Sequence, residues 1–338
     1  MLYDIVIIGA GPAGISMAVE STGVGLKPER ILVIERSAEH SFSIRKYYPD
    51  KKLVTANYKG FQSACTGALC IPDLTKHETI TYLDKAISDN NINVNYNETV
   101  WKIFYSGEDS KERFTVFTDK SEYKTKTIAI AIGILGKPNK PAYKIPLTLK
   151  DRALFDITTA EIMNSRVLVV GGGDSASEYC QFLVQDGNDV TLSYRRAEFS
   201  RMNDINRESL LALGREGRVK LFLNSDIISL EDQTGRPVVT FSGAEECTEE
   251  FDYVIYALGG TTPHNFLKSI GIEFNGDEPV LKEGYETSVP GMFLLGDLSA
   301  GTKGGSIIWA FNSANTAMKR ICRKYLESAE NCMENAAE

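Results

Sequence analysis

A glycine-rich turn between an apolar strand and a helix occurs twice in this sequence, at residues 9–14 (GAGPAG) and at residues 171–176 (GGGDSA). A short β-branched run precedes each turn, and a helical pattern and a second apolar run follow it. Such a turn requires glycine at fixed offsets, because the chain reverses sharply and the helix packs closely on the strand. Two copies of this unit predict an α/β chain with two Rossmann-like domains of the three-layer ββα type.

The composition is that of an ordinary globular protein. The 338 residues suggest two domains, and 43% of them are hydrophobic and 24% charged, which argues against disorder. We see no apolar run as long as a membrane span and no secretory leader, so we expect a cytoplasmic protein. In that compartment the six cysteines are expected to be mostly thiols. The net charge of −8 makes nucleic acid and anionic membranes poor partners.

The first turn has the residues that a dinucleotide requires. Gly9 allows the tight turn, Gly11 lets the backbone approach a pyrophosphate, and Gly14 lets the helix pack on the strand. The phosphates would then lie against free N–H groups at the helix N-terminus. Glu35 ends the next predicted strand, where a carboxylate binds ribose hydroxyls and disfavours a 2′-phosphate. The alternative is a tight turn that binds no ligand.

The second turn is followed by basic residues where the first is followed by an acid. The strand after it ends in Tyr194, Arg195 and Arg196, and Arg201 comes shortly afterwards. Guanidinium groups bind a 2′-phosphate through charge-assisted, forked hydrogen bonds, so this unit predicts NADP rather than NAD. If these arginines instead form a solvated surface turn, that preference does not follow.

Further stretches suit a chain with two dinucleotides, one of which we expect to be FAD. Apolar strands end near Gly133 and Gly259, where a chain crosses beside a cofactor. Asp297 follows another buried strand, and its carboxylate is placed to hold the ribityl hydroxyls of a flavin. Ser306 and Ile307 open the last predicted helix, whose N-terminus would point at the flavin ring.

This order of motifs resembles the two-dinucleotide-fold flavoproteins of the pyridine nucleotide-disulfide oxidoreductase superfamily, and the length resembles their thioredoxin-reductase-like group. The resemblance implies a discontinuous FAD-binding domain, residues 1–137 and 263–338, with an NADPH-binding domain, residues 138–262, inserted into it. It also implies a homodimer. The positions expected to bind FAD are Gly9, Gly11, Pro12, Ala13, Gly14, Glu35, Arg36, Ala131, Gly133, Gly296, Asp297, Ser306 and Ile307. Those expected to bind NADPH are Gly171, Gly173, Asp174, Ser175, Ala176, Arg195, Arg196, Arg201 and Gly259.

One departure from that group bears on the function. Thioredoxin reductases carry a Cys-x-x-Cys just before the second glycine turn, but no cysteine lies between Gly136 and Gly171. Residues 136–146 and 57–60 instead resemble the flavodoxin:quinone reductases and the related ferredoxin–NADP reductases. We therefore predict an NADPH-dependent flavin oxidoreductase that passes electrons through FAD to a non-thiol acceptor such as flavodoxin, ferredoxin or a quinone. No side chain is assigned a catalytic role, because the flavin carries the chemistry.

Cys65 and Cys70 leave a second hypothesis open. Their Cys-x4-Cys spacing and the following Ile-Pro are similar to the glutathione-reductase branch, although the pair lies farther beyond Glu35 than in that branch. Cysteines at this spacing form a bridge where their Cα atoms come within about 7 Å. The pair would then serve a thiol–disulfide reductase of the thioredoxin-reductase type; otherwise it is two ordinary thiols. A third hypothesis is a flavin-binding sensor or assembly protein that keeps its nucleotides but does not turn over.

A basic stretch is the candidate surface for an acidic redox protein. It consists of Arg45, Lys46, Lys51, Lys52 and Lys59. Such a stretch attracts flavodoxin or ferredoxin electrostatically, or else it is a solvated loop. The aromatic candidates to stack on a flavin are Tyr47, Tyr48, Tyr58 and Trp309. His40, His77 and His264 are scattered and predict no metal site.

Overall fold

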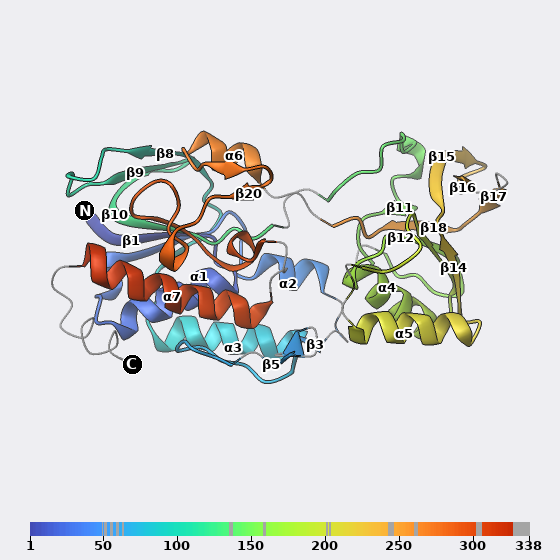
Figure 1. The fold of residues 1–338 in the computed structure, drawn as a ribbon, viewed down its shortest axis with the longest axis horizontal. Coiled ribbons are helices and arrows are strands. Elements are labelled where there is room, and N and C mark those ends of the chain that lie inside the picture. Colours follow the sequence, from blue (N-terminus) through green and yellow to red (C-terminus); the bar gives the residue numbers. More distant parts are fainter. Residues whose placement is uncertain are drawn as a thin grey trace. The chain divides into compact units, whose positions relative to one another are not determined.

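The chain folds into two compact units (Figure 1). The computed structural model describes residues 1–48, 50, 53–54, 57–58, 61–62, 64–134, 138–157, 160–200, 202, 204–242, 247–259, 263–301 and 306–326. The first unit comprises Met1–Tyr58, Gln62–Gly136 and Thr262–Glu338, and the second comprises Lys59–Phe61 and Lys137–Thr261. The first unit is therefore discontinuous in sequence.

The first unit is built on a seven-stranded sheet. Its order is β7 (Val94–Asn95), β2 (Ile31–Ile34), β1 (Leu2–Ile8), β10 (Glu122–Ile130), β9 (Phe114–Thr118) and β8 (Val100–Tyr105), and β21 (Met292–Leu294) also pairs with β10. The strands β7, β2, β1, β10 and β21 are parallel, whereas β9 runs antiparallel to both β10 and β8. The central strand β1 is an apolar run because a parallel strand is buried on both faces.

Helices cover one face of this sheet. They are α1 (Pro12–Gly23), α3 (Lys76–Asp89) and α7 (Ile307–Tyr325), which lie together in Figure 1. Ile5 and Ile7 of β1 face the core formed with α1 and α7, while Val6 and Ile8 face a second core that includes α6 (His264–Ser269). Helix α3 begins with a capping box, in which the side chains of Thr75 and Glu78 each accept a hydrogen bond from the other residue's backbone N–H.

The second unit has a five-stranded parallel sheet. Its order is β11 (Ala153–Leu154), β18 (Tyr253–Tyr256), β12 (Arg166–Val170), β13 (Asp189–Tyr194) and β14 (Val219–Leu223), and its helices are α4 (Asp174–Gln185) and α5 (Asp204–Arg215). An antiparallel meander consists of β15 (Asp226–Gln233), β16 (Arg236–Ser242) and β17 (Cys247–Glu250). Sheets with crossover helices in both units confirm the predicted α/β fold class.

The remaining elements are short. One is the helix α2 (Phe42–Tyr47). Three two-stranded pairs are formed by β3 (Leu53–Val54) with β6 (Leu74–Thr75), by β4 (Asn57–Tyr58) with β5 (Phe61–Gln62), and by β19 (Phe274–Asn275) with β20 (Glu278–Pro279). The 3-10 turns are Pro28–Arg30, Leu147–Leu149, Glu283–Tyr285 and Gly296–Ser299. Composition predicts a polar loop at about 37–60 and an interdomain connection at 136–165. The structure corrects both predictions, because the first stretch contains α2 and the second contains β11, which pairs with β18.

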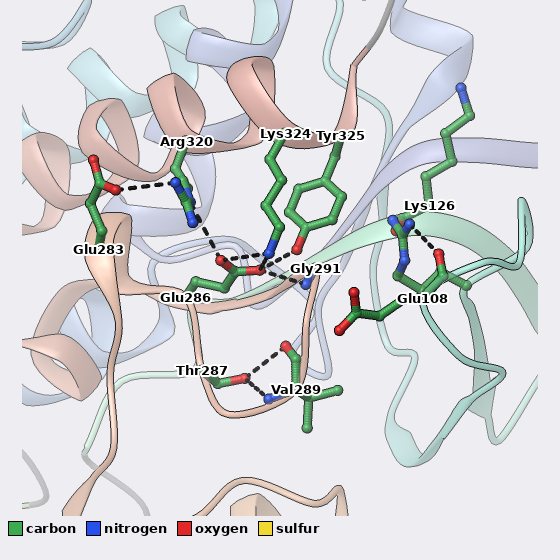
Figure 2. A network of polar contacts seen from close by, with 11 residues as sticks. Glu108, Lys126, Glu283, Glu286, Thr287, Val289, Gly291, Arg320, Lys324 and Tyr325 are labelled. Atoms are coloured by element: carbon green, nitrogen blue, oxygen red, sulfur yellow. Dashed lines mark hydrogen bonds and ion pairs between the residues drawn. The ribbon is translucent and has the colours of Figure 1, made fainter.

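A buried carboxylate fastens α7 to the segment before β21 (Figure 2). The side chain of Glu286 is 1% exposed. It accepts hydrogen bonds from the N–H of Gly291 (3.0 Å), from Nζ of Lys324 (3.2 Å) and from the hydroxyl of Tyr325. Nε of Arg320 lies 3.4 Å from the same carboxylate. Burial alone raises the pKa of Glu286, but these donors outweigh burial, and the net pKa lies below its ordinary value.

Candidate functional site

The candidate site is a cavity of about 400 Å³ in the first unit. It lies at the carboxyl ends of β1, β2, β10 and β21, and the first turns of α1 and α7 form part of its wall. Strand β1 pairs with β2 on one side and with β10 on the other. Ligands of open α/β sheets bind at this point, where the chain leaves adjacent strands in opposite directions.

The structure brings nearly all the positions predicted to bind FAD to this one cavity. Gly14 is the exception, because it lies beneath the turn and not at the cavity surface. The lining residues from the predicted set are Gly9, Gly11, Pro12, Ala13, Glu35, Arg36, Ala131, Gly133, Gly296, Asp297, Ser306 and Ile307. They come from both ends of the described chain and meet only because β21 and α7 join the sheet and helix layer begun by β1 and α1.

The glycine turn after β1 is tight because the carbonyl groups around it leave no room for side chains. Gly9 has φ +102°, and a Cβ there would lie 2.6 Å from the carbonyl oxygen of Ala131. A Cβ on Gly14 would lie 1.9 Å from the carbonyl oxygen of Gly9. At Gly11 the nearest atom would be 3.9 Å away, so the backbone there is open to the cavity. Pro12 at the first helical position leaves the helix N-terminus facing the same space.

Glu35 is held by the backbone of two turns. Its Oε2 accepts a hydrogen bond from the N–H of Ala10 (2.8 Å), and its Oε1 accepts one from the N–H of Ser37 (2.8 Å). The residue is 8% exposed and lines the cavity. Each carboxylate oxygen has a second acceptor position, so a ligand hydroxyl has a fixed, charged partner at this point.

Asp297 is the other acid of the predicted set on the cavity wall. It follows β21 after Gly296, whose φ of +62° turns the chain towards the cavity. Burial raises the pKa of Asp297. Ser306, which also lines the cavity, caps α7 by accepting a hydrogen bond from the N–H of Trp309 (3.1 Å). The N-terminus of α7 therefore also opens onto the cavity.

Several cavity residues were not found from the sequence. Ser41, Phe42, Glu98, Thr99 and Phe266 line the cavity from loops and short helices with no recognisable motif. Of the aromatic candidates, Tyr48 lines the cavity, Tyr47 and Trp309 do not, and the side chain of Tyr58 lies outside the described part of the chain. Residues that meet through hydrogen bonds between distant loops leave no periodic pattern in the sequence, so these positions could not be predicted.

Glu98 is the most constrained of these unpredicted residues. It is 3% exposed and accepts hydrogen bonds from Thr118 (2.6 Å), Tyr123 (2.8 Å) and Asn95 (3.0 Å). Its backbone N–H donates to the carbonyl oxygen of Glu35 (3.0 Å). Glu98 therefore fixes the loop after β7 against the end of β2, next to Glu35.

The second unit repeats the geometry of the first around its own glycine turn. The N–H of Gly171 donates to the carbonyl oxygen of Ser193 (3.1 Å), just as the N–H of Gly9 donates to that of Ile34 (2.8 Å). Gly171 has φ +154°, and a Cβ there would lie 2.4 Å from the carbonyl oxygen of Ala257. Strand register makes Tyr194 the counterpart of Glu35. The second unit therefore has a tyrosine, and not a carboxylate, at the position equivalent to Glu35.

The predicted NADPH residues cluster at this turn, with exceptions. Gly173 caps α4, Asp174 and Ser175 are in its first turn, and Gly259 follows β18. Ala176 is fully buried, so it contributes packing at this turn. Arg195 and Arg196 are exposed at the end of β13, and Arg201 lies outside the described residues. A cavity of about 230 Å³ in this unit is lined by Ile157, by residues 160–163 and by the C-terminal end of α4 with Asp186, and none of the predicted residues borders it.

The ring of Tyr194 occupies the place above the second turn that the carboxylate of Glu35 takes in the first. A Cβ on Gly172 would lie within 2.4 Å of that ring, so the aromatic side chain requires glycine there. Tyr194 also stacks on Phe199, with ring centroids 5.3 Å apart. The two turns thus share a backbone arrangement and differ in chemistry at the position where the sequence predicts a contact with a ribose.

The expectation of mostly thiol cysteines is wrong. Cys65 and Cys70 form a disulfide with Cα atoms 5.6 Å apart, and Cys322 is also disulfide-bonded. Cys180 is a buried thiol and Cys247 an exposed one, while Cys332 lies outside the described residues. The reason is local: a short loop brings Cys65 and Cys70 within bridging distance, which composition and compartment do not reveal. Neither of these two cysteines lines the cavity.

The predicted basic stretch is partly engaged within the protein. Arg45 pairs with Glu39 (3.3 Å) and Asp84 (3.7 Å), and it donates to the carbonyl oxygen of His40 (2.9 Å). Lys46 lies over the rings of Phe42 and Tyr47. Lys51, Lys52 and Lys59 lie outside the described residues. No helix in the described part of the chain is long and apolar enough to cross a membrane.

Two glycine turns, each after a strand that has parallel neighbours on both sides, define a protein with two dinucleotide-binding folds. Residues 6–296 match the pyridine nucleotide-disulphide oxidoreductases, and the chain belongs to this family. It is 30% identical over 316 residues to a ferredoxin–NADP reductase of Ignicoccus hospitalis, with 89% of this chain and 92% of that protein covered. A ferredoxin–NADP reductase of Metallosphaera sedula is 25% identical over 313 residues, covering 88% and 85%.

Solved structures confirm the predicted two-domain fold. The bacillithiol disulfide reductase of Staphylococcus aureus has a TM-score of 0.79 at 22% identity, covering 96% of this chain and 99% of that one. The thioredoxin reductase of Lactococcus lactis has a TM-score of 0.74 at 21% identity, covering 99% of both chains. The enzyme class predicted from the sequence, a pyridine nucleotide-dependent oxidoreductase of this superfamily, is confirmed by the family match.

Proposed function

We propose that this protein is an FAD-dependent NADPH oxidoreductase that passes electrons from NADPH through the flavin to a non-thiol acceptor, with ferredoxin the first candidate. The observation that carries the proposal is the single cavity lined by the positions predicted for FAD. The proposal places the enzyme in the cytoplasm. A homodimer, and flavodoxin or a quinone as acceptor, remain predictions from the resemblance.

The residues around the cavity fit FAD. Gly11 and the N-terminus of α1 offer open backbone for a pyrophosphate, and Glu35 offers a carboxylate held in place for ribose hydroxyls. The raised pKa of Asp297 indicates a carboxylate removed from water without a compensating charge, which suits neutral hydroxyl donors such as a ribityl chain. The N-terminus of α7 directs its positive dipole end towards the same cavity.

A bound flavin supplies a centre that accepts hydride from a nicotinamide and releases electrons singly or in pairs. The protein's part is to bind and orient both nucleotides, so no side chain needs to move a proton for hydride to arrive. The second unit would hold NADPH at its glycine turn, with Arg195 and Arg196 exposed beside the position of the 2′-phosphate. The absence of an acid at Tyr194 removes the group that would repel this phosphate.

The relatives favour ferredoxin as the acceptor, because they are named ferredoxin–NADP reductases. The sequence between Gly136 and Gly171 also lacks the dithiol that thioredoxin reductases use. A thiol–disulfide reductase that uses the Cys65–Cys70 disulfide remains the second candidate, and the observed bridge is what favours it.

An anaerobic titration of the flavin-loaded enzyme with NADPH distinguishes the two candidates. We expect the flavin absorbance band to bleach fully at about one NADPH per flavin, because the flavin is then the only two-electron centre in the path. Uptake of about two equivalents would reveal a second such centre and contradict direct transfer. Ferredoxin reduction, followed by its visible absorbance, then tests the acceptor.

Arg195 and Arg196 test the assignment of the second unit. Replacing both by alanine is expected to raise the KM for NADPH at least about tenfold, because a hydrogen bond to a charged group contributes about 1.5–3 kcal/mol. The KM for NADH should change little, because NADH has no 2′-phosphate. The matched control is Arg218→Ala, which removes an exposed arginine that follows α5 in the same unit. Equal losses with both nucleotides would contradict the assignment.

A further inference from the structure

A disulfide-closed loop, residues 64–71, is docked on the helices that wall the cavity. The N–H of Thr66 donates to Oδ1 of Asn312 (2.9 Å), and Nδ2 of Asn312 donates to the carbonyl oxygen of Ala64 (2.9 Å). The N–H of Ala68 donates to Oε1 of Glu20 (2.7 Å). Asn312 belongs to α7 and Glu20 to α1, so one loop is bonded to both helices.

The carboxylate of Glu20 links the docked loop to α7. The residue is 7% exposed, and its Oε2 accepts a hydrogen bond from Nδ2 of Asn315 on α7 (3.1 Å). A buried carboxylate requires such donors, and the loop provides one of them. Gly67 lies so close that a Cβ there would be 2.4 Å from Oε1. The position of the loop and the pairing of α1 with α7 are therefore coupled through one carboxylate.

The same two helices form the cavity wall a short distance along their axes. Pro12 and Ala13 of α1 line the cavity, as do Ile307 and Ala310 of α7. Asn312 lies within one turn of Ala310 on α7, and Glu20 lies about two turns beyond Ala13 on α1. A change in the docked loop would therefore reach the cavity through two rigid elements and without any contact to the cofactor itself.

The two sulfur atoms differ in access. Cys70 is exposed, whereas Cys65 is half-buried and packs against the apolar core of the first unit. The N–H of Cys70 is held by the hydroxyl of Tyr82 on α3 (3.1 Å). A thiolate from outside therefore meets Sγ of Cys70 first, and Cys65 is the sulfur that leaves.

We propose that the Cys65–Cys70 disulfide is a reversible thiol-exchange site for external dithiols, and that its reduction undocks the 64–71 loop and weakens flavin retention in the neighbouring cavity. This site is distinct from the proposed electron path, since neither sulfur lines the cavity. It does not depend on the identity of the electron acceptor.

The reaction balances in two steps. A thiolate of the dithiol attacks Sγ of Cys70, the bond between Cys65 and Cys70 breaks, and a mixed disulfide forms while Cys65 leaves as a thiolate that takes up a proton. The second thiol of the dithiol then attacks its own sulfur in the mixed disulfide and releases Cys70. Two electrons and two protons pass from the dithiol to the protein, and the dithiol becomes a disulfide.

The test compares flavin-loaded enzyme prepared without reductant with the same enzyme treated with dithiothreitol. Labelling with N-ethylmaleimide and peptide mass mapping should find Cys65 and Cys70 unlabelled before treatment and labelled after it. Amide hydrogen exchange at Thr66 and Ala68 should become about tenfold faster in the reduced enzyme, the factor expected when a hydrogen bond of typical net strength is lost. Flavin should also be lost faster on dialysis.

The chain offers internal controls. Exposed Cys247 should be labelled in both samples, and buried Cys180 in neither. The variant Asn312→Ala undocks the loop but keeps the bridge, so it should show fast exchange at Thr66 without new labelling. The double variant Cys65→Ser/Cys70→Ser should behave like the reduced enzyme without any treatment.

Three outcomes would overturn the proposal. One is full labelling of Cys65 and Cys70 before reduction, and another is equal amide exchange and flavin retention in the two redox states. The third is reduction of the bridge by NADPH alone, which would make the pair an internal relay. Bleaching of the flavin by NADPH is recorded on the same samples, so failure of the proposed function is seen separately from failure of the thiol site.

Discussion

Replacing Gly14 by alanine is expected to give a protein that retains flavin at least about tenfold less well and unfolds at a lower temperature. The new Cβ would lie 1.9 Å from the carbonyl oxygen of Gly9, a backbone atom that cannot move without opening the turn. Overpacking of this kind costs about 1–3 kcal/mol or more. The flavin-to-protein absorbance ratio after gel filtration, and Tm by calorimetry, measure the two effects.

Gly23→Ala is the matched control for this prediction. Gly23 ends the same helix, and a Cβ there would meet nothing within 4 Å. An alanine at a compatible helical site raises stability by about 0.4–1 kcal/mol, so this variant should retain flavin and show an equal or higher Tm. If the Gly14 and Gly23 variants bound flavin alike, the tight packing at the first turn would not matter for the cofactor.

Replacing Glu286 by glutamine is expected to destabilise the first unit by about 2 kcal/mol, or several degrees in Tm. The change removes the charge that Arg320 and Lys324 pair with and leaves the Tyr325 hydroxyl with a weaker acceptor (Figure 2). The expected cost is below that of a fully buried pair because the Arg320 and Lys324 side chains are 26% and 39% exposed. Glu283→Gln is the control, because this exposed partner of Arg320 should contribute below about 0.5 kcal/mol.

The contribution of Glu286 to the free energy of unfolding should decrease in acid. Its pKa in the folded protein lies below the ordinary value of 4.5, so the carboxylate contributes its full stability above that pH. The contribution is lost as the pH falls from 4.5 through the folded pKa. The difference in unfolding free energy between the wild type and Glu286→Gln, from urea titrations, should therefore be constant at neutral pH and shrink in acid. A difference that grew in acid would contradict the lowered pKa.

The parts of the fold that the sequence predicts are those with local signals. The apolar runs around the two glycine turns predicted β1, β12, α4 and β13 closely, because strand periodicity, glycine offsets and helix starts are all encoded within a few residues. Helix α5 was not predicted, because four of the five apolar residues of Asp204–Arg215 are consecutive, at 210–213, and show no helical period by themselves. Helix α2 was missed because six residues are too few to show a period.

In the candidate site too, the residues with a local sequence signal were the ones predicted. Glu35 and Asp297 were found because each lies within three residues of the end of a buried strand. Glu98, Ser41 and Phe266 were not, because they reach the cavity through contacts between segments far apart in the chain. The Cys65–Cys70 bridge depends on how a short loop closes, and spacing alone left it open. The sequence predicts a partner surface that includes Arg45. In the structure, Arg45 instead forms ion pairs with Glu39 and Asp84 of its own unit.

The discontinuity of the first unit sets an order for folding during translation. Strand β10 is made early, but β21, which pairs with it, and α7, which packs on α1, leave the ribosome only after all of the second unit. At typical synthesis rates the intervening segment takes on the order of ten seconds. The second unit is therefore expected to be folded while β10 of the first unit still lacks its partner β21 and α1 still lacks the packing of α7. Asp297 and Ser306 are made after the whole of the second unit, so the cavity can capture its ligand only once that unit has left the ribosome.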